Sequence, residues 1–225
     1  MIVRRTGAAP IFITQPDHAA LAARIMAHWR AGGFPTSPRR EVILLAIAEH
    51  DNGWQEVDAA PIVDASGEVL DFMTVPMDIR RGVWPRGVAR LASQPYAAAL
   101  VAQHALHVYR RYRANADWHP FFAEMESARD HHLRAAQSMS LDDLLADYAF
   151  VRIGDLLSLT FCNAWTAPQT EEFGYTIRLD ADRLRVGPDP FEGASLAIEV
   201  AGRTVAPHEG PVTIRGIASG EPAPR

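Results

Sequence analysis

The chain has 225 residues and a mass of 24.8 kDa, and its 48% apolar and 22% charged residues are typical of a protein with a hydrophobic core. Its net charge of −5 and pI of about 6.0 argue against a nucleic-acid coat or a polybasic membrane anchor. All 22 basic residues are arginine, which excludes catalysis by lysine, and the single cysteine, Cys162, excludes an internal disulfide and a multi-cysteine metal site.

No segment is apolar for long enough to span a membrane. The longest uninterrupted apolar run, Val42 to Ala48, is far shorter than the ~20 residues that a spanning helix needs. The first residues lack a charged head followed by a long apolar stretch, so they predict no signal peptide. We therefore expect a cytoplasmic protein that binds neither membranes nor nucleic acid.

In chain order, the first predicted element is a β-hairpin over residues 2–13, with apolar runs on both sides of a turn at Thr6–Gly7. Five helices are expected to follow. The first begins at Thr14, with Pro16 in its first turn and Asp17 at the capping-box position. The expected helices cover about 14–30, 40–51, 95–113, 120–137 and 140–163.

The end of the chain is predicted to form short strands. Residues 174–216 contain apolar or alternating runs separated by glycine, proline and aspartate. We therefore expect a mainly α protein, in which a helical domain over residues 14–165 is joined by a small β-subdomain formed by residues 1–13 and 170–225. The long connection over residues 54–85 is typical of a functional or inserted loop. The predicted strands are Tyr175–Leu179, Leu184–Val186, Leu196–Val200 and Val212–Ile214.

The second predicted helix carries an imidazole and a carboxylate at its end. His50 shares a helix face with Ile43 and Ile47, and Asp51 follows it directly. The negative end of the helix dipole favours a cation at this position. A carboxylate and a neutral imidazole together suit a divalent transition metal.

Two further polar residues lie on predicted apolar faces. His104 lies in the apolar stripe of the third helix, and Asp155 lies in that of the fifth. A buried carboxylate needs a cation, a metal or hydrogen-bond donors, and Arg152 could also supply the charge. Each residue alone is more often an ordinary core residue. Because His50, Asp51, His104 and Asp155 come from three helices, together they predict one shared metal site.

The remaining histidines of the helical region carry weaker signals. His28, His107 and His119 are interpreted as surface or capping residues. His131 and His132 are ambiguous, because His132 shares a stripe with Met125 and Ala128 and could bind a second ion. No nucleophile elbow, zinc-protease helix or dinucleotide-binding glycine loop is present in the sequence.

The order of His18, then His50–Asp51, then Asp155 resembles the H…HD…D ligand series of the HD superfamily. Members are helical bundles that hold a divalent metal and mostly hydrolyse phosphate esters, and a few hold two irons and oxidise small molecules. The sequence also resembles an uncharacterised bacterial family with a domain of unknown function. That resemblance is carried by Gln15-Pro-Asp-His18, Glu49-His-Asp-Asn-Gly-Trp54, the segment around His104, Asp155-Leu-Leu-Ser-Leu-Thr-Phe-Cys162 and Pro190–Phe191.

The sequence departs from the HD phosphodiesterases at two points. Those branches carry lysine where Trp54 stands, and their Gly-Tyr-Pro signature is absent here. Both departures argue against cleavage of cyclic dinucleotides. A site with two irons would need a further histidine from the fourth helix, which only His131 or His132 could supply.

The HD resemblance implies a metal-dependent hydrolase that acts on a small phosphorylated compound. The implied cofactor is one or two divalent ions of Fe, Mn, Zn, Co or Ni, and Asp51 or Asp17 would accept a proton from the attacking water. Two alternatives stay open: a di-iron oxygenase, and a non-catalytic helical domain whose β-tail binds a partner. The expected metal ligands are His18, His50, Asp51, His104 and Asp155. The arginines expected either to contact phosphate or to form an ordinary solvated surface are Arg80, Arg81, Arg86 and Arg90.

Overall fold

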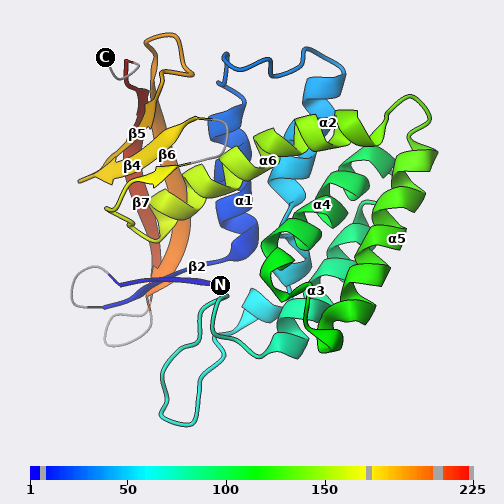
Figure 1. The fold of residues 1–225 in the computed structure, drawn as a ribbon. Helices are drawn as coiled ribbons and strands as arrows, with labels where there is room; N and C mark the ends of the chain where they lie inside the picture. Colours follow the sequence, from blue (N-terminus) through cyan, green and yellow to red (C-terminus); the bar gives the residue numbers. More distant parts are fainter. Residues whose placement is uncertain (6–8, 171–173, 205–209, 223–225) are drawn as a thin grey trace.

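The computed structural model describes residues 1–5, 9–170, 174–204 and 210–222 (Figure 1). The predicted turn at Thr6–Gly7 lies outside the described residues. The helices are α1 (Gln15–Met26), α2 (Arg39–Glu49), α3 (Met77–Arg90), α4 (Pro95–Val108), α5 (His119–Ala135) and α6 (Leu141–Cys162), with short 3-10 helices η1 (Asn52–Trp54), η2 (Val57–Ala59), η3 (Arg110–Tyr112) and η4 (Ala116–Trp118). The strands are β1 (Ile2–Arg4), β2 (Ile11–Ile13), β3 (Gln169–Thr170), β4 (Thr176–Asp180), β5 (Arg183–Gly187), β6 (Ser195–Thr204) and β7 (Gly210–Gly220).

Side-chain caps begin two of the helices where the sequence predicts them. The Thr14 hydroxyl accepts a hydrogen bond from the Asp17 backbone N–H at 3.1 Å, and Ser140 forms a complete capping box with Asp143. Helix α1 ends at Met26, before the expected end near Arg30. The five predicted helices are all present, whereas α3 forms partly within the segment that was expected to be a long connection.

The expectation of a mainly α protein with a small β-subdomain is wrong. The protein is about 48% helical and 19% strand, and its seven strands form one curled mixed sheet in the order β1-β2-β6-β7-β5-β4-β3. The reason is that β6 and β7, at 10 and 11 residues, are longer than the predicted runs and extend the pairing into one full sheet. Strand β2 pairs antiparallel with β6, and the 11-residue β7 joins β6 to β5. The sheet is therefore a full layer of an α/β fold.

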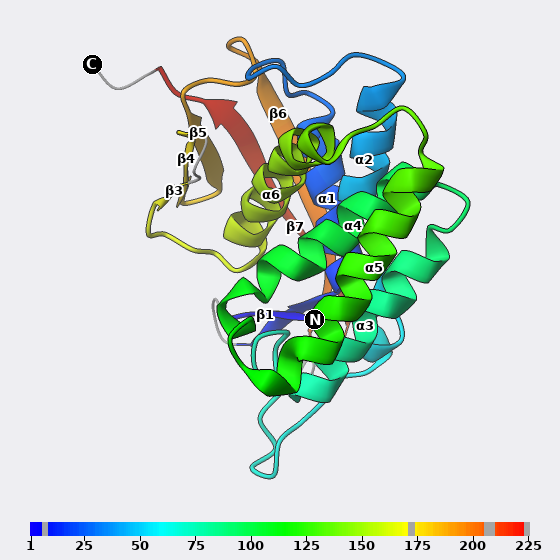
Figure 2. The same cartoon turned by 45° about the vertical axis from the view of Figure 1, so that its right-hand side comes forward.

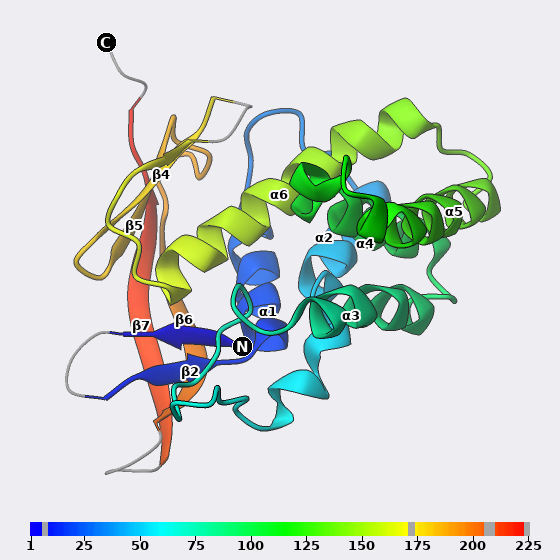
Figure 3. The same ribbon diagram turned by 60° about the horizontal axis from the view of Figure 1, so that its bottom comes forward.

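Helices α1 and α6 lie against the sheet, and α2 to α5 lie on their far side (Figures 1 and 3). Figure 2 shows α4 and α5 side by side. One continuous core crosses both layers, with Ile198 and Leu184 from the sheet packed in the same cluster as Leu21 and Val151 from the helices. A second, largely aromatic cluster around Trp84 and Trp118 includes side chains of α3, α4 and α5.

Within the described residues, no helix combines the length and the apolar character that crossing a membrane requires.

Candidate metal centre

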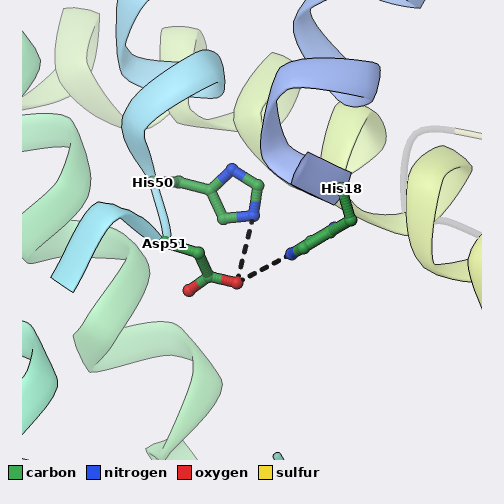
Figure 4. A group of neighbouring side chains, drawn as sticks. All are labelled: His18, His50 and Asp51. Atoms are coloured by element: carbon green, nitrogen blue, oxygen red, sulfur yellow. Dashed lines mark hydrogen bonds and ion pairs between the residues drawn. The ribbon is translucent and has the colours of Figure 1, made fainter. Parts of the chain in front are cut away.

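The structure brings the five predicted ligand residues together where α1, α2, α4 and α6 meet. His18 Nε2 lies 2.8 Å from Asp51 Oδ2, and His50 Nε2 lies 3.6 Å from the same oxygen (Figure 4). On the other side of His50, its Nε2 lies 3.4 Å from Asp155 Oδ1. His104 Nε2 lies 3.8 Å from Asp155 Oδ2. Three imidazole nitrogens thus face two carboxylates in a buried cluster.

In each imidazole ring, Nδ1, the nitrogen that faces away from the carboxylates, lies close to an oxygen of the surrounding helices. His50 Nδ1 lies 2.7 Å from the Ile47 carbonyl oxygen. Because a carbonyl oxygen only accepts, Nδ1 must carry the hydrogen, and in the neutral ring Nε2 keeps its lone pair. This Nε2 is buried and makes no hydrogen bond within the described part of the chain. His50 therefore presents an unpartnered donor atom to the cluster.

His18 and His104 are oriented in the same way. The Ser158 hydroxyl lies 2.9 Å from His18 Nδ1 and 3.0 Å from the Asp155 carbonyl oxygen. The Tyr148 hydroxyl lies 3.0 Å from His104 Nδ1. Metal-ligating histidines are commonly held through the second ring nitrogen in this manner.

The cluster requires a positive charge at its centre. The lone pair on His50 Nε2 faces carboxylate oxygens at 3.4 and 3.6 Å and is repelled by them unless a proton or a metal ion lies between the atoms. His18, His50 and His104 are each at most 3% exposed, so water cannot supply the missing interactions freely. This donor set of imidazole and carboxylate is one that divalent transition metals bind.

The pKa values of His50 and of the two carboxyl groups show the same demand for positive charge, whereas that of His104 does not. Burial lowers the pKa of His50, but Asp51 and Asp155 outweigh it and raise that pKa to about 9. Burial also lowers the pKa of His104, to about 4, and here the charge of Asp155 is too weak to compensate. Burial raises the pKa of both carboxyl groups, yet interactions with the imidazoles hold the pKa of each below its usual value.

The five residues form two overlapping triads. The ligand atoms of His18, His50 and Asp51 lie within 4.8 Å of one another, and so do those of His50, His104 and Asp155. Opposite ligands of one ion lie about 4.2 Å apart when each bond is about 2.1 Å, so either triad can close on an ion with small movements. His50 belongs to both triads and has one free nitrogen, which favours a single ion.

The segment after His50 is locked in place by close backbone packing. Asp51 leaves the helix with φ −113° and ψ 18°, and η1 follows. A Cβ on Gly53 would lie 2.0 Å from the Val83 carbonyl oxygen of α3, so only glycine fits. Arg86 donates to the Gly53 carbonyl oxygen at 3.0 and 2.8 Å, and Arg90 donates to that of Asn52. These contacts hold Asp51 beside His18.

A pocket of about 100 Å³ opens beside the cluster. Asp51, His104 and Asp155 line it, and most of the remaining wall is apolar or aromatic. Sequence reasoning missed three pocket residues with buried polar atoms that make no hydrogen bond to a described residue: Gln15 through Oε1, and Trp54 and Trp84 through Nε1. The signal for Gln15 and Trp54 was their place in the motifs around His18 and His50. The rest of the lining is Phe72, Val108, Tyr109 and Leu159.

Asp17 does not join the cluster. Its carboxylate accepts a hydrogen bond from the Thr14 hydroxyl at 2.6 Å, and it lines a different pocket together with Phe12 and Asp58. The interpretation of Asp17 as a proton acceptor at the site therefore lacks structural support. Asp51, the other candidate, lies in the cluster.

The other sequence candidates lie elsewhere. His131 and His132 contact each other on α5, with ring centroids 5.2 Å apart, and neither belongs to a ligand group found among the described residues. His28 and His119 are exposed, as expected of surface residues. His107 is half-buried and packs on Tyr148.

The four arginines expected either to contact phosphate or to form a solvated surface make contacts outside the pocket. Arg80 donates to the Val75 carbonyl oxygen, and Arg81 pairs with Asp78. Arg86 and Arg90 hold η1 through backbone oxygens, as described above, and also pair with Glu56. Among the described residues, no arginine lines the pocket beside the cluster.

Comparison with protein families gives a match that covers most of the chain. The family described as "Protein of unknown function (DUF3891)" matches residues 1–207. The chain belongs to this family. All five residues of the cluster lie within the DUF3891 match, so the predicted resemblance to an uncharacterised family is confirmed, while the HD resemblance stays a prediction. Neither the curated proteins nor the solved structures contain a significant match to this DUF3891 member.

Proposed function

We propose that the protein is a hydrolase that depends on a divalent metal ion held by the cluster. His18, His50, Asp51, His104 and Asp155 would supply the ligands. The observation that carries the proposal is His50 Nε2, a buried atom without a hydrogen-bond partner among the described residues that faces the carboxylate oxygens of Asp51 and Asp155. Its tautomer is fixed by the Ile47 carbonyl oxygen, so this nitrogen is available to a cation.

A divalent ion in such a site supplies a nucleophile at neutral pH, because it lowers the pKa of a bound water from about 15.7 to about 7. The protein's own residues have separate tasks. The low pKa values of Asp51 and Asp155 keep both carboxylates ionised at neutral pH, so each can hold the ion, but they also make both groups weak acceptors of a proton from water. The apolar walls around Phe72 and Leu159 limit the access of other water molecules.

The net charge of the metal-loaded site indicates which substrate charge the pocket can accept. Two carboxylates, three neutral imidazoles and one divalent ion sum to zero, and the four arginines proposed for phosphate binding lie away from the pocket. A phosphate ester would bring up to two negative charges into this apolar pocket with little compensation. For the proposed metal-dependent hydrolase, the geometry therefore favours an uncharged substrate over a phosphorylated one.

The direct test is the metal content of the purified protein, measured by inductively coupled plasma mass spectrometry. We expect about one equivalent of a divalent ion in the native chain and its loss in His50→Ala and in Asp51→Ala. His28→Ala, which removes an exposed imidazole, is the matched control and should retain the ion. Circular dichroism of each variant separates loss of the ion from loss of the fold.

Three outcomes would contradict the proposal. Absence of metal from the native protein, or unchanged content in both variants, would leave a non-catalytic domain as the better account. Two irons per chain and consumption of O₂ would favour the di-iron oxygenase. A hydrolase should instead release product from an activated ester such as p-nitrophenyl acetate without O₂, with a redox-silent ion such as Zn²⁺, and lose that activity with EDTA.

A further inference from the structure

The pocket beside the metal cluster contains uncharged hydrogen-bonding groups that nothing in the described structure satisfies. The Gln15 side-chain N–H donates to Asp51 Oδ2 at 3.2 Å, and because an ionised carboxylate only accepts, Gln15 Oε1 must point away from it. This Oε1 and the Trp54 indole N–H are both buried without a partner among the described residues. The two side chains are each 2% exposed.

Such groups are costly to leave unpaired. A buried donor or acceptor without a hydrogen bond destabilises the fold, so buried polar atoms are nearly always paired in native proteins. Burial raises the pKa of the Tyr109 hydroxyl and the Trp84 indole lowers it in part, so Trp84 Nε1, unlike the other two atoms, has a polar group beside it. Trp54 and Gln15 are therefore the donor and the acceptor that the pocket holds for a ligand.

The walls of the pocket define what kind of ligand fits. The aromatic and aliphatic side chains of Trp54, Phe72, Trp84 and Leu159 contribute no charge, and the volume of about 100 Å³ admits a compact group. A neutral group that offers both an acceptor and a donor would pair the indole N–H and the amide oxygen together. A carboxamide, with its C=O and N–H, has this combination.

We propose that the substrate is a small neutral amide, recognised by the Trp54 indole N–H and by Gln15 Oε1. This inference rests on the proposed hydrolase function and names its substrate class. In the reaction, water adds its oxygen to the carbonyl carbon and the C–N bond breaks. One product is the carboxylic acid, and the proton removed from water passes to the leaving nitrogen, which departs as the amine or ammonia. No oxidant or reductant is needed.

The test uses protein labelled with ¹⁵N in its tryptophan side chains, both loaded with Zn²⁺ and treated with EDTA. Each indole N–H gives its own signal in a ¹H–¹⁵N spectrum, and Trp54→Phe assigns that of Trp54. Acetamide and inorganic phosphate are titrated separately. We expect acetamide to shift the Trp54 signal saturably and phosphate to leave it unchanged.

Variants measure the two recognition contacts. Trp54→Phe and Gln15→Met should each weaken acetamide binding about fivefold, the size expected for one neutral hydrogen bond, as followed through the Trp84 signal. Trp118→Phe removes a buried indole N–H from the same aromatic cluster but not from the pocket, and should bind acetamide as the native protein does.

The inference is overturned if phosphate shifts the Trp54 signal at lower concentration than acetamide, or if Trp54→Phe and Gln15→Met bind acetamide as tightly as the native chain. Metal content measured on the same samples separates this result from failure of the proposed function. Acetamide binding in EDTA-treated protein would support the recognition contacts even if the native chain held no ion.

Discussion

The imidazoles of His18, His50 and His104 share one arrangement, with Nδ1 held by an oxygen of a neighbouring helix segment and Nε2 turned to a carboxylate. The oxygen beside Nδ1 holds the direction of each ring, and at His50, where it is a carbonyl oxygen, it also fixes the tautomer. The affinity of the site for a cation should therefore depend on residues that never touch the ion. Ser158, which is fully buried, is the clearest of these residues.

We expect Ser158→Ala to lower the affinity for the metal ion by about tenfold or more, because His18 Nδ1 loses the hydroxyl that holds the ring in its orientation. The measurement is competition with a metal-binding dye of known affinity. Thr160→Val is the control: it removes another buried hydroxyl of α6, which donates to the Leu156 carbonyl oxygen and not to a histidine. Equal affinities in the two variants would contradict this role of Ser158.

Helical spacing predicted the positions of His104 and Asp155, but it could not decide between the two aspartates that adjoin a histidine. Adjacent side chains on a helix diverge by about 100°, so Asp17 turns away when His18 faces the cluster. Asp51 also adjoins a histidine, yet it reaches the cluster because α2 ends at Glu49 and Asp51 has left the helix. The exact end of a helix is a tertiary property that one sequence defines poorly.

At the scale of elements, the contact between η1 and α3 could not be predicted from the sequence. Helix α3 contains Pro85 and two glycines, residues that disfavour a helix on intrinsic grounds, so the segment was expected to be a connection. Packing against η1 stabilises α3 despite its low intrinsic helix propensity. Gly53 lies against the Val83 carbonyl oxygen, and Arg86 closes the contact by donating to the Gly53 carbonyl oxygen.

Gly53→Ala should destabilise the protein by about 1–3 kcal/mol and weaken metal binding, because the added Cβ forces η1 away from α3 and moves Asp51. Gly82 lies on α3, is exposed, and a Cβ there meets nothing within 4 Å, so Gly82→Ala should stabilise the protein by about 0.5–1 kcal/mol. Urea unfolding of both variants measures the difference. The contact is not tight if the two variants unfold at the same urea concentration.

At the scale of the whole molecule, the sequence revealed most of the strands but not the sheet that they form. The alternating runs near Ile198 and Leu184 were readable locally, whereas the pairing of β2 with β6 joins residues almost 200 positions apart in the chain. The sequence analysis placed both ends of the chain in one β-subdomain, but the order of the strands and the extent of their pairing leave no local signal. The consequence is an α/β fold, with one core shared by sheet and helices.

Because four helices contribute to the cluster, the charge at its centre should affect the stability of the whole fold. The raised pKa of His50 means that its protonation stabilises the metal-free fold fully below pH 6.5, the ordinary pKa, and that this stabilisation is lost as the pH rises towards about 9. The loss should be on the order of 3 kcal/mol. His104, with its pKa lowered to about 4, changes its charge at more acidic pH and does not contribute in this range.

We therefore expect the Tm of EDTA-treated protein to fall between pH 6.5 and pH 9, and that of metal-loaded protein to stay nearly constant because the ion replaces the proton. Thermal unfolding followed by circular dichroism measures both. His50→Gln without metal is the control and should lack this component of the pH dependence. Parallel curves for the EDTA-treated and metal-loaded proteins would contradict the account.

The most direct test of the metal centre is anomalous X-ray diffraction from crystals of the metal-loaded protein, recorded on both sides of the absorption edge of the ion. The account predicts an anomalous peak bounded by His50 Nε2, Asp51 and Asp155, with bonds of about 2.0–2.2 Å to nitrogen and oxygen. A chain that carries a stoichiometric ion at another place, such as His131 and His132, would contradict it.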